Sequence, residues 1–356
     1  MTKQRTPPPL HYVVWRSQPG GAESSVKYYV DRFTGRRDLF LYSLRTSANA
    51  ISPDASLHFE SGDDRNWRCY LLFFRYCRRH RSGLFHLIST GPLTLLLALL
   101  AGVRNPVYHI HGTIYWKGAA DRLYLKALWR LNSLFAVTYI ANSAYSAAIF
   151  RKKVLAVRST VIYNGFLVEQ FLKKRFLRTG LRRMAYIGRL HPGKNVELVL
   201  RLFEAVAGEM PGLELHIAGD GMLRAPLEAQ ARNSPYGDRI VFHGWVSDMA
   251  AFYQSVDLFV FLSAFESFGN VLIEALLTGL PILTSDVPVF NEIHGGETAF
   301  LLGDPEAYDA VEQTFRQAIA DFPLLAQKAY ALGGHLGETF SMQRHLDAVE
   351  HAYSRY

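Results

Sequence analysis

Two glutamates eight residues apart, Glu266 and Glu274, flank a glycine in the stretch FESFGNVLIEAL (265–276). The apolar segment 258–263 before them is typical of a buried strand, and the residues from 270 onward have the apolar spacing of a helix. Helical side chains lean toward the helix N-terminus, so we expect both carboxylates to face one loop, where they could accept hydrogen bonds from sugar hydroxyls. Alternatively, Glu266 is solvated surface charge and Glu274 only complements the helix dipole, a contribution of about 0.3–1 kcal/mol.

A second candidate loop is GRLHPGKN (188–195), which follows another predicted strand. Arg189 offers a guanidinium fork, and Lys194 offers a point charge. The predicted helix after them would present backbone amides and the positive end of its dipole, a combination that suits a diphosphate. The pattern is not a P-loop, because Asn195 stands where that motif needs Ser or Thr. A solvated turn is the alternative interpretation.

Two further loops are ambiguous on their own. IAGDG (217–221) is more typical of a tight turn than of a site. In FHGWVSD (242–248) the backbone near Gly244 and Val246 could read a nucleobase edge; the alternative is a turn with a packing tryptophan. The entrance of the helix after Glu266 could give its amides to phosphate oxygens, through Phe268, Gly269 and Asn270. Together these loops gather cations, amides and two carboxylates at one sheet edge, which fits a nucleotide sugar.

The elements that must position these loops alternate between strand and helix, as in a parallel sheet covered by helices. In the second half we expect strands at 183–188, 213–219, 239–246, 258–263 and 281–286, and helices at 195–209, 222–232, 248–255 and 270–279. In the first half we expect strands at 11–15, 38–44, 84–89, 107–112, 136–143 and 159–165, and helices at 22–33 and 65–81. Ligands of such sheets bind outside the carboxyl ends of the strands.

The chain is long enough for two domains. We expect an acceptor-binding domain at 1–168, a nucleotide-sugar domain at 169–338 with a hinge near 168–183, and a C-terminal helix at 339–356 that packs back on the first domain. The apolar stretch 84–103 is broken by Gly91 and Pro92 and is too short in its apolar core to cross a bilayer, so it reads as a buried strand, a turn and a buried helix.

Composition narrows the class of protein. Hydrophobic residues make up 49% and charged residues 20%, which excludes a disordered chain. The only cysteines, Cys69 and Cys77, have no metal-type spacing, and their number favours a reducing cytoplasm. The first residues show no pattern of a cleavable signal peptide.

Charge is distributed unevenly along the chain. Residues 1–170 carry 23 Lys and Arg against 9 Asp and Glu, a net +14, whereas residues 171–356 carry 16 against 22, a net −6. This asymmetry indicates an anionic surface, polymer or ligand that faces the first half. A solvated basic face is the alternative.

The order YIGRLHPGKN, GDG, VFHGWV and FLSAFESFGNVLIEALLTGLP resembles the family 4 glycosyltransferases, a retaining group with the GT-B fold. The similarity is strong from 184 to 302 and loose before 110. GGAE (20–23) matches the family's glycine loop, and HIHGT (109–113) resembles its histidine loop. The resemblance implies an α/β architecture of two Rossmann-like, doubly wound domains facing a central cleft, with the C-terminal helix returning to the first domain.

The resemblance also implies roles. Glu274 would bind the ribose, Glu266 the transferred sugar, and Arg189 and Lys194 the diphosphate, whose leaving charge they neutralise in place of a metal ion. His111 would lie near the donor sugar, although a satisfied buried histidine is the alternative. The implied catalytic group is Glu266, His111, Arg189 and Lys194, and the implied donor-binding group adds Gly20, Gly21, Gly244, Val246, Phe268, Gly269, Asn270 and Glu274. No cofactor and no metal are expected.

The expected donor is a UDP- or GDP-sugar, and the expected acceptor is a saccharide or a lipid-linked saccharide of bacterial surface polysaccharide or lipopolysaccharide. The basic segment 65–81 suits docking to an anionic membrane, so we expect a cytoplasmic protein on the inner face of the cell membrane. One alternative is a GT-B nucleotide-sugar epimerase, which needs no acceptor. Another is a basic nucleic-acid-binding protein, but the sequence has no recognition motif of that class, and we expect no nucleic acid partner.

Overall fold

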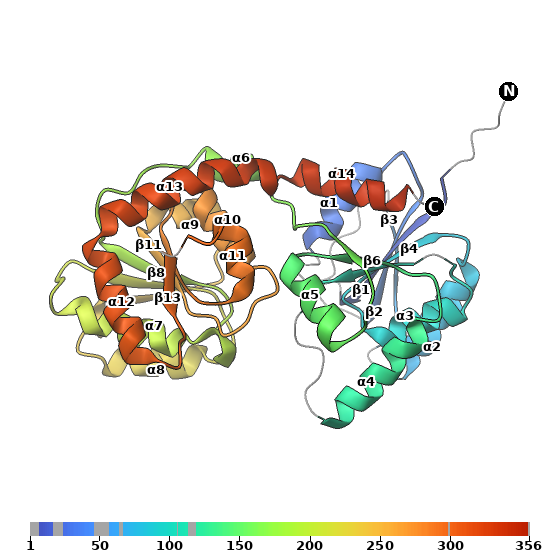
Figure 1. Ribbon diagram of the computed structural model, residues 1–356, viewed down its shortest axis with the longest axis horizontal. Coiled ribbons are helices and arrows are strands. Elements are labelled where there is room, and N and C mark those ends of the chain that lie inside the picture. Colours follow the sequence, from blue (N-terminus) through green and yellow to red (C-terminus); the bar gives the residue numbers. More distant parts are fainter. Residues whose placement is uncertain are drawn as a thin grey trace. The chain divides into compact units, whose positions relative to one another are not determined.

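The computed structural model describes residues 7–16, 24–45, 57–63, 67–104, 106–112, 119–297 and 300–354. The chain divides into two compact units, each built on one parallel sheet with helices on its faces (Figure 1). The first unit comprises Met1–Gly165 and Gln343–Tyr356, and the second comprises Phe166–Met342.

The sheet of the first unit has seven strands in the order β3-β2-β1-β4-β5-β6-β7. They are β1 (Leu10–Arg16), β2 (Leu39–Arg45), β3 (Leu57–Ser61), β4 (Leu84–Ile88), β5 (Val107–Ile110), β6 (Thr138–Ala141) and β7 (Ser159–Val161). All neighbouring strands are parallel. The strand order reverses beside β1, which is the doubly wound pattern.

Helices cover both faces of this sheet: α1 (Ser24–Phe33), α2 (Arg68–Arg79), α3 (Pro92–Leu100), α4 (Ala119–Asn132), α5 (Ala144–Lys153) and α14 (Met342–Tyr353). On one face, buried side chains of α2–α5 pack on strand residues such as Phe85 and Tyr108. Because strand side chains alternate between faces, Tyr12, His86 and His109 point to the opposite face, where α1 and α14 lie.

The second unit has six strands in the order β10-β9-β8-β11-β12-β13, all parallel. They are β8 (Arg183–Ile187), β9 (Glu214–Ala218), β10 (Ile240–Gly244), β11 (Leu258–Phe261), β12 (Ile282–Ser285) and β13 (Leu301–Gly303). The helices are α6 (Val168–Leu172), α7 (Val196–Ala207), α8 (Arg224–Asn233), α9 (Met249–Ser255), α10 (Asn270–Leu277), α11 (Pro288–His294), α12 (Tyr308–Ala320) and α13 (Phe322–Thr339). Every residue of β11 and β12 is buried, as a central parallel strand requires.

Every strand and helix predicted from the sequence is present, and the stretch 84–103 forms β4, a turn and α3 as expected. Within the described residues, no helix is both long and apolar enough to span a bilayer. The sequence did not predict β3, β13, α4–α6 or α11–α13.

The predicted hinge near 168–183 belongs to the second unit, whose boundary follows Gly165. Phe171 of α6 is buried. The guanidinium of Arg178 is also buried and donates to the carbonyl oxygens of Tyr253, at 2.7 Å, and Thr278, at 2.5 Å. The segment lacks a periodic apolar pattern because a buried arginine, whose two terminal nitrogens donate to backbone carbonyls, takes the place of an apolar anchor.

Candidate active site

The loops after β8 and β11 meet through an ion pair between Lys194 and Glu266. The two strands are parallel neighbours, so their carboxyl ends bring these loops to the same edge of the sheet. The Lys194 ammonium also donates a 3.3 Å hydrogen bond to the hydroxyl of Ser263. Each side chain of the pair is only 18% exposed, which distinguishes this contact from a solvated surface ion pair.

Backbone contacts hold the Lys194 loop against the Glu266 loop. Residues 192–194 form a 3₁₀ turn, and Asn195 then takes a left-handed conformation before α7 begins. The Asn195 side-chain amide donates to the carbonyl of Leu262 at 2.8 Å, and the Ala264 amide donates to the carbonyl of Gly193 at 2.9 Å. Asn195, which rules out a P-loop in the sequence, therefore joins the two loops.

Arg189, the second cation of the predicted site, lies at the same edge with an exposed side chain. Its carbonyl oxygen accepts a 3.0 Å hydrogen bond from the hydroxyl of Tyr186, which fixes the backbone of the loop. The guanidinium forms no hydrogen bond or ion pair with any residue that the structure describes. It thus has all its donors available for a ligand.

Glu274 lies in α10, one turn beyond the helix entrance, and is partly buried. Its carboxylate accepts a 2.8 Å hydrogen bond from the hydroxyl of Tyr253 in α9. Burial raises the pKa of Glu274 to about 7, and the hydrogen bond from Tyr253 acts in the opposite direction. Sequence reasoning missed Tyr253, whose only signal is an aromatic hydroxyl on the apolar face of a short helix.

The entrance of α10 depends on Gly269, whose φ of +98° lies in the left-handed region. A Cβ at this position would also lie 3.2 Å from the Phe290 ring. Phe268 is buried and packs edge-on against Phe340, whereas Asn270 is partly buried and begins the helix. Gly269 is thus required by the backbone, and Phe268 anchors the turn.

The glycine turn at 217–221 has a packing role. The Gly219 amide donates to the carbonyl of Gly244 at 2.7 Å, and a Cβ on Gly219 would lie 1.8 Å from the carbonyl oxygen of Gly188. Three predicted loops are therefore in direct backbone contact. After Gly244, Trp245 is 76% exposed and Val246 is partly exposed. The alternative of a packing tryptophan is wrong.

In the first unit, His111 follows β5 at the carboxyl edge of its own sheet. The ring is partly buried and lies against the ring of His109, with 3.9 Å between centroids. Burial, assisted by the nearby His345, lowers the pKa of His111 to about 3, so its imidazole is neutral. Gly20 and Gly21 lie outside the described residues.

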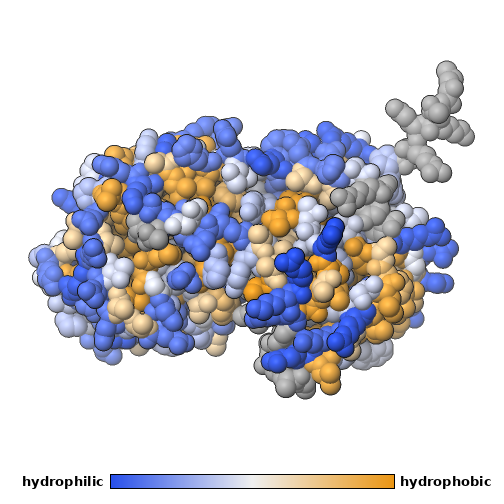
Figure 2. All heavy atoms as spheres, viewed as in Figure 1, coloured by the Kyte–Doolittle hydropathy of each residue, from blue (hydrophilic) through white to orange (hydrophobic). Residues whose placement is uncertain are grey.

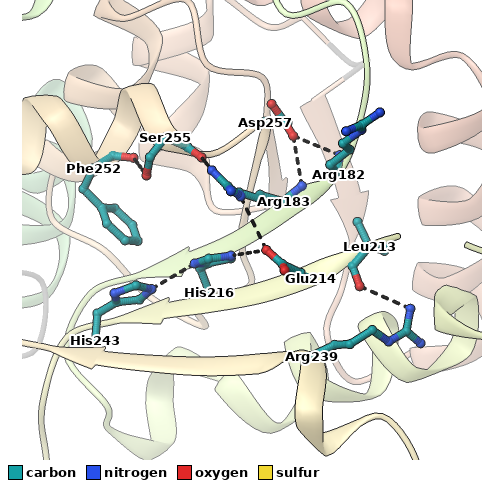
Figure 3. Close-up of polar contacts among 10 residues, drawn as sticks. All are labelled: Arg182, Arg183, Leu213, Glu214, His216, Arg239, His243, Phe252, Ser255 and Asp257. Carbon is teal, nitrogen blue, oxygen red and sulfur yellow. Dashed lines mark hydrogen bonds and ion pairs between the residues drawn. The ribbon is translucent and has the colours of Figure 1, made fainter. Parts of the chain in front are cut away.

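Another polar network, drawn in Figure 3, lies mainly at the amino ends of the second sheet. Glu214 accepts from His216 at 3.1 Å, and His216 shares a 2.9 Å hydrogen bond with His243 on the edge strand β10. Asp257 accepts from the backbone amides of Arg182 and Arg183, each at 2.9 Å. Arg183 and Glu214 begin their strands, opposite to the loops of the candidate site, so this network ties strand ends together.

Known proteins resemble the chain in sequence. Residues 182–321 match the family described as Glycosyl transferases group 1, which agrees with the glycosyltransferase resemblance of this part of the chain, while the assignment to family 4 stays a prediction. A GDP-mannose:cellobiosyl-diphosphopolyprenol alpha-mannosyltransferase of Xanthomonas campestris is 30% identical over 61% of this chain and 60% of that protein. The lipopolysaccharide core biosynthesis glycosyltransferase LpsE of Rhizobium meliloti is 33% identical over 43% of each chain. The matches thus span less than two thirds of these relatives.

Solved structures resemble the whole chain. HepE of Anabaena, in complex with UDP-glucose, superposes with a TM-score of 0.79 at 18% identity, over 98% of this chain and 100% of that one. The similarity confirms the predicted fold class, GT-B, with its two doubly wound units and a C-terminal helix that returns to the first. The epimerase alternative gains no support from these relatives.

Proposed function

We propose that this chain, whose residues 182–321 match the glycosyl transferases of group 1, transfers a sugar from a nucleotide diphosphate sugar to a saccharide or lipid-linked saccharide. One observation carries the proposal: Lys194 and Glu266 form a shielded ion pair at the carboxyl edge of the sheet, with the exposed Arg189 on the same loop as the lysine. A cation for a phosphate and a carboxylate for sugar hydroxyls thus lie in contact.

The diphosphate would bind to Arg189 and Lys194. Arg189 is already available, and Lys194 has three donors, so it can contact a phosphate oxygen while it keeps one bond to Ser263 or Glu266. As the bond between sugar and phosphate breaks, negative charge grows on the leaving phosphate, and two positioned cations stabilise that charge without a metal ion. We therefore propose a metal-independent reaction.

Glu266 would accept hydrogen bonds from hydroxyls of the transferred sugar, and Glu274 those from the ribose. The hydrogen bond from Tyr253 fixes the carboxylate of Glu274 while leaving further lone pairs for a ligand. In this arrangement the chain binds the donor at both ends, and we propose front-face transfer with retention at the anomeric carbon, as the family resemblance implies.

The acceptor assignment rests on relatives. The Xanthomonas relative is named for a diphosphopolyprenol-linked acceptor, and the Rhizobium relative for lipopolysaccharide core synthesis. We propose an acceptor of the same class, a saccharide or lipid-linked saccharide of bacterial surface polysaccharide synthesis. The donor is a UDP- or GDP-sugar, and the reaction takes place on the cytoplasmic side of the cell membrane.

A basic surface on the first unit supports peripheral membrane association. Beside α2, Trp67 is 65% exposed, and Leu71 and Leu72 of the helix are exposed next to Arg75 and Arg78. Figure 2 shows hydrophobic patches within the hydrophilic surface of this unit. Exposed apolar side chains between arginines suit the boundary of an anionic membrane, where both kinds of side chain gain contacts.

The experiment is a nucleotide-release assay with a panel of UDP- and GDP-sugars and lipid-linked acceptors, with and without a chelator. We expect release with one donor, undiminished by the chelator, and a product whose anomeric configuration by NMR matches the donor. Lys194→Ala should abolish release. Lys328→Ala is the matched control, because Lys328 pairs with Glu297 at 3.0 Å elsewhere in the same unit. Absence of release with every combination of donor and acceptor would refute the proposal.

A further inference from the structure

A chain of buried polar side chains connects the C-terminal helix α14 to His111 within the first unit. The hydroxyl of Tyr353, in α14, lies 2.5 Å from Nδ1 of His86 in β4. Nε2 of His86 lies 3.3 Å from Nδ1 of His109 in β5. His109 in turn contacts His111, with 3.9 Å between ring centroids. Three contacts thus lead from the last helix to the carboxyl edge of the sheet.

The chain is shielded from water. Tyr353, His86 and His109 are fully buried, so each ring is confined by packing as well as by its hydrogen bonds. Burial lowers the pKa of His86 to about 3 and that of His109 well below its ordinary value. Neutral imidazoles can donate from one ring nitrogen and accept at the other, so each link has one donor and one acceptor.

A second histidine holds α14 on the same layer. Nδ1 of His345 lies 2.6 Å from the carbonyl oxygen of Tyr163, and its Nε2 lies 2.7 Å from the hydroxyl of Tyr29 in α1. A carbonyl only accepts, so Nδ1 donates and the neutral ring accepts from Tyr29 at Nε2. Burial lowers the pKa of His345. The helix that carries Tyr353 is therefore fixed in rotation about its axis.

Such a chain has a cost that apolar residues would avoid, because a buried donor or acceptor left without a partner is unfavourable, and Nε2 of His109 has no hydrogen-bond partner among the described residues. The benefit of the chain is that it fixes the orientation of each ring. Packing alone allows an imidazole to flip by about 180°, whereas a hydrogen bond selects one of the two orientations. His109 is the side chain that contacts His111, and His86 is the side chain that fixes His109.

We propose that His86 and His109 are positioning residues, which hold the ring of His111 in the orientation that the donor sugar requires, with Tyr353 of the C-terminal helix as their anchor. This inference rests on the proposed function and on the family resemblance, which implies that His111 lies near the donor sugar. It assigns α14 a part in the site of the first unit. Catalysis should therefore depend on a tyrosine four contacts away from the sugar.

The test uses the full chain and two substitutions of His86, by glutamine and by asparagine, whose side-chain amides differ in their distance from the backbone. In His86→Gln the amide occupies the place of Nε2 and keeps the contact with His109, whereas in His86→Asn it occupies the place of Nδ1 and keeps only the contact with Tyr353. We expect His86→Asn to lower kcat for nucleotide release about tenfold with donor KM within about threefold, because a misoriented group costs catalysis more than binding. His86→Gln should recover part of the lost kcat, because it keeps the contact with His109 but loses the one with Tyr353.

Two controls separate positioning from folding. His11 is equally buried and bonds to the hydroxyl of Tyr76 at 2.7 Å, away from His111. His11→Phe and His86→Phe should lower the melting temperature similarly, but only His86→Phe should lower kcat. In a His111→Ala background, the further effect of His86→Asn on kcat should shrink below about twofold, because the two residues act in one chain.

Equal losses of kcat in His86→Asn and His86→Gln, or a full effect of His86→Asn in the His111→Ala background, would overturn the inference. A third readout does not depend on activity: the ¹⁵N chemical shifts of His111 in labelled protein. These shifts should change in His86→Asn and stay near those of the wild type in His11→Phe. If the wild type released no nucleotide, the proposed function would fail, and unchanged His111 shifts would independently reject the positioning chain.

Discussion

The hydroxyl of Tyr253 in α9 donates a 2.8 Å hydrogen bond to the carboxylate of Glu274 in α10. Tyr253 is fully buried, and burial together with the charge of Glu274 raises its own pKa far above the ordinary value, so it stays a donor. The carboxylate thus has one fixed partner in a setting that raises its pKa to about 7. Glu274 is therefore a group whose charge changes near neutral pH.

Donor affinity should depend on the protonation of Glu274. A protonated carboxyl has lost acceptor capacity for ribose hydroxyls, so calorimetric affinity for an intact nucleotide sugar should fall as pH drops from 8 to 6. Glu274→Gln should bind about tenfold more weakly at pH 8, the usual scale of a charged hydrogen bond, and without this pH dependence. Tyr253→Phe should move the midpoint to higher pH, because the lost hydrogen bond favours the ionised form. Equal pH dependence in Glu274→Gln would contradict the assignment.

The same carboxylate should lower stability at alkaline pH. The folded pKa of about 7 exceeds the ordinary value of 4.5, so the folded state holds the proton more tightly and stability falls as pH rises from 4.5 through 7. Glu274→Gln should therefore raise the free energy of unfolding at pH 8 by at most about 3 kcal/mol, and by much less at pH 5. Urea titrations at both pH values measure this; a gain of equal size at both would argue against a raised pKa.

Removing either partner of the Lys194–Glu266 pair should have different effects. Glu266→Ala should lower kcat about 100-fold with a small change in donor affinity, because the carboxylate contacts the sugar that moves. Lys194→Ala should weaken both donor binding and kcat, because it removes phosphate charge and leaves Glu266 unpaired. Steady-state kinetics with the identified donor measures kcat and donor KM separately for each variant. If both variants retained wild-type kinetics, the pair would be structural.

Gly219→Ala should disrupt the candidate site through the backbone. The new Cβ would lie 1.8 Å from the Gly188 carbonyl oxygen, and the φ of +138° is itself unfavourable for alanine. We expect a loss of about 2 kcal/mol or more in the second unit, measured by thermal unfolding, together with weaker donor binding. Gly212→Ala is the control, since no atom lies within 4 Å of its Cβ position. A Gly219→Ala protein as stable as this control would refute the close approach.

Membrane association should depend on α2. In sedimentation with vesicles containing an anionic phospholipid, Arg75→Glu with Arg78→Glu should lower bound protein several-fold at low salt, because each basic residue contributes about 1 kcal/mol near such a surface. The matched control, Arg182→Glu with Arg232→Glu, reverses two exposed arginines in the second unit and should bind like the wild type. If both double variants bound vesicles equally well, α2 would not be the membrane-binding surface.

The sequence by itself determined the architecture and the loops of the site. Alternation of apolar strands and amphipathic helices required two parallel sheets, and ligands of such sheets meet the carboxyl ends of the strands. The order of the elements along the chain was therefore enough to predict that Arg189, Lys194 and Glu266 lie at one edge of the sheet. The edge strand β3 was not predicted because its sequence, LHFES, has only one buried residue and no apolar run.

Only the tertiary structure decided which side chains are partners. Lys194 and Glu266 stand 72 positions apart, and their ion pair depends on β8 and β11 being neighbours in the sheet. Tyr253 as the partner of Glu274 requires the packing of α9 beside α10. The contacts of His86 with His109 and Tyr353 join residues from β4, β5 and the last helix. The spacing of apolar residues predicts which face of a helix or strand a residue occupies. Its hydrogen-bond partner, however, depends on which elements pack against that face.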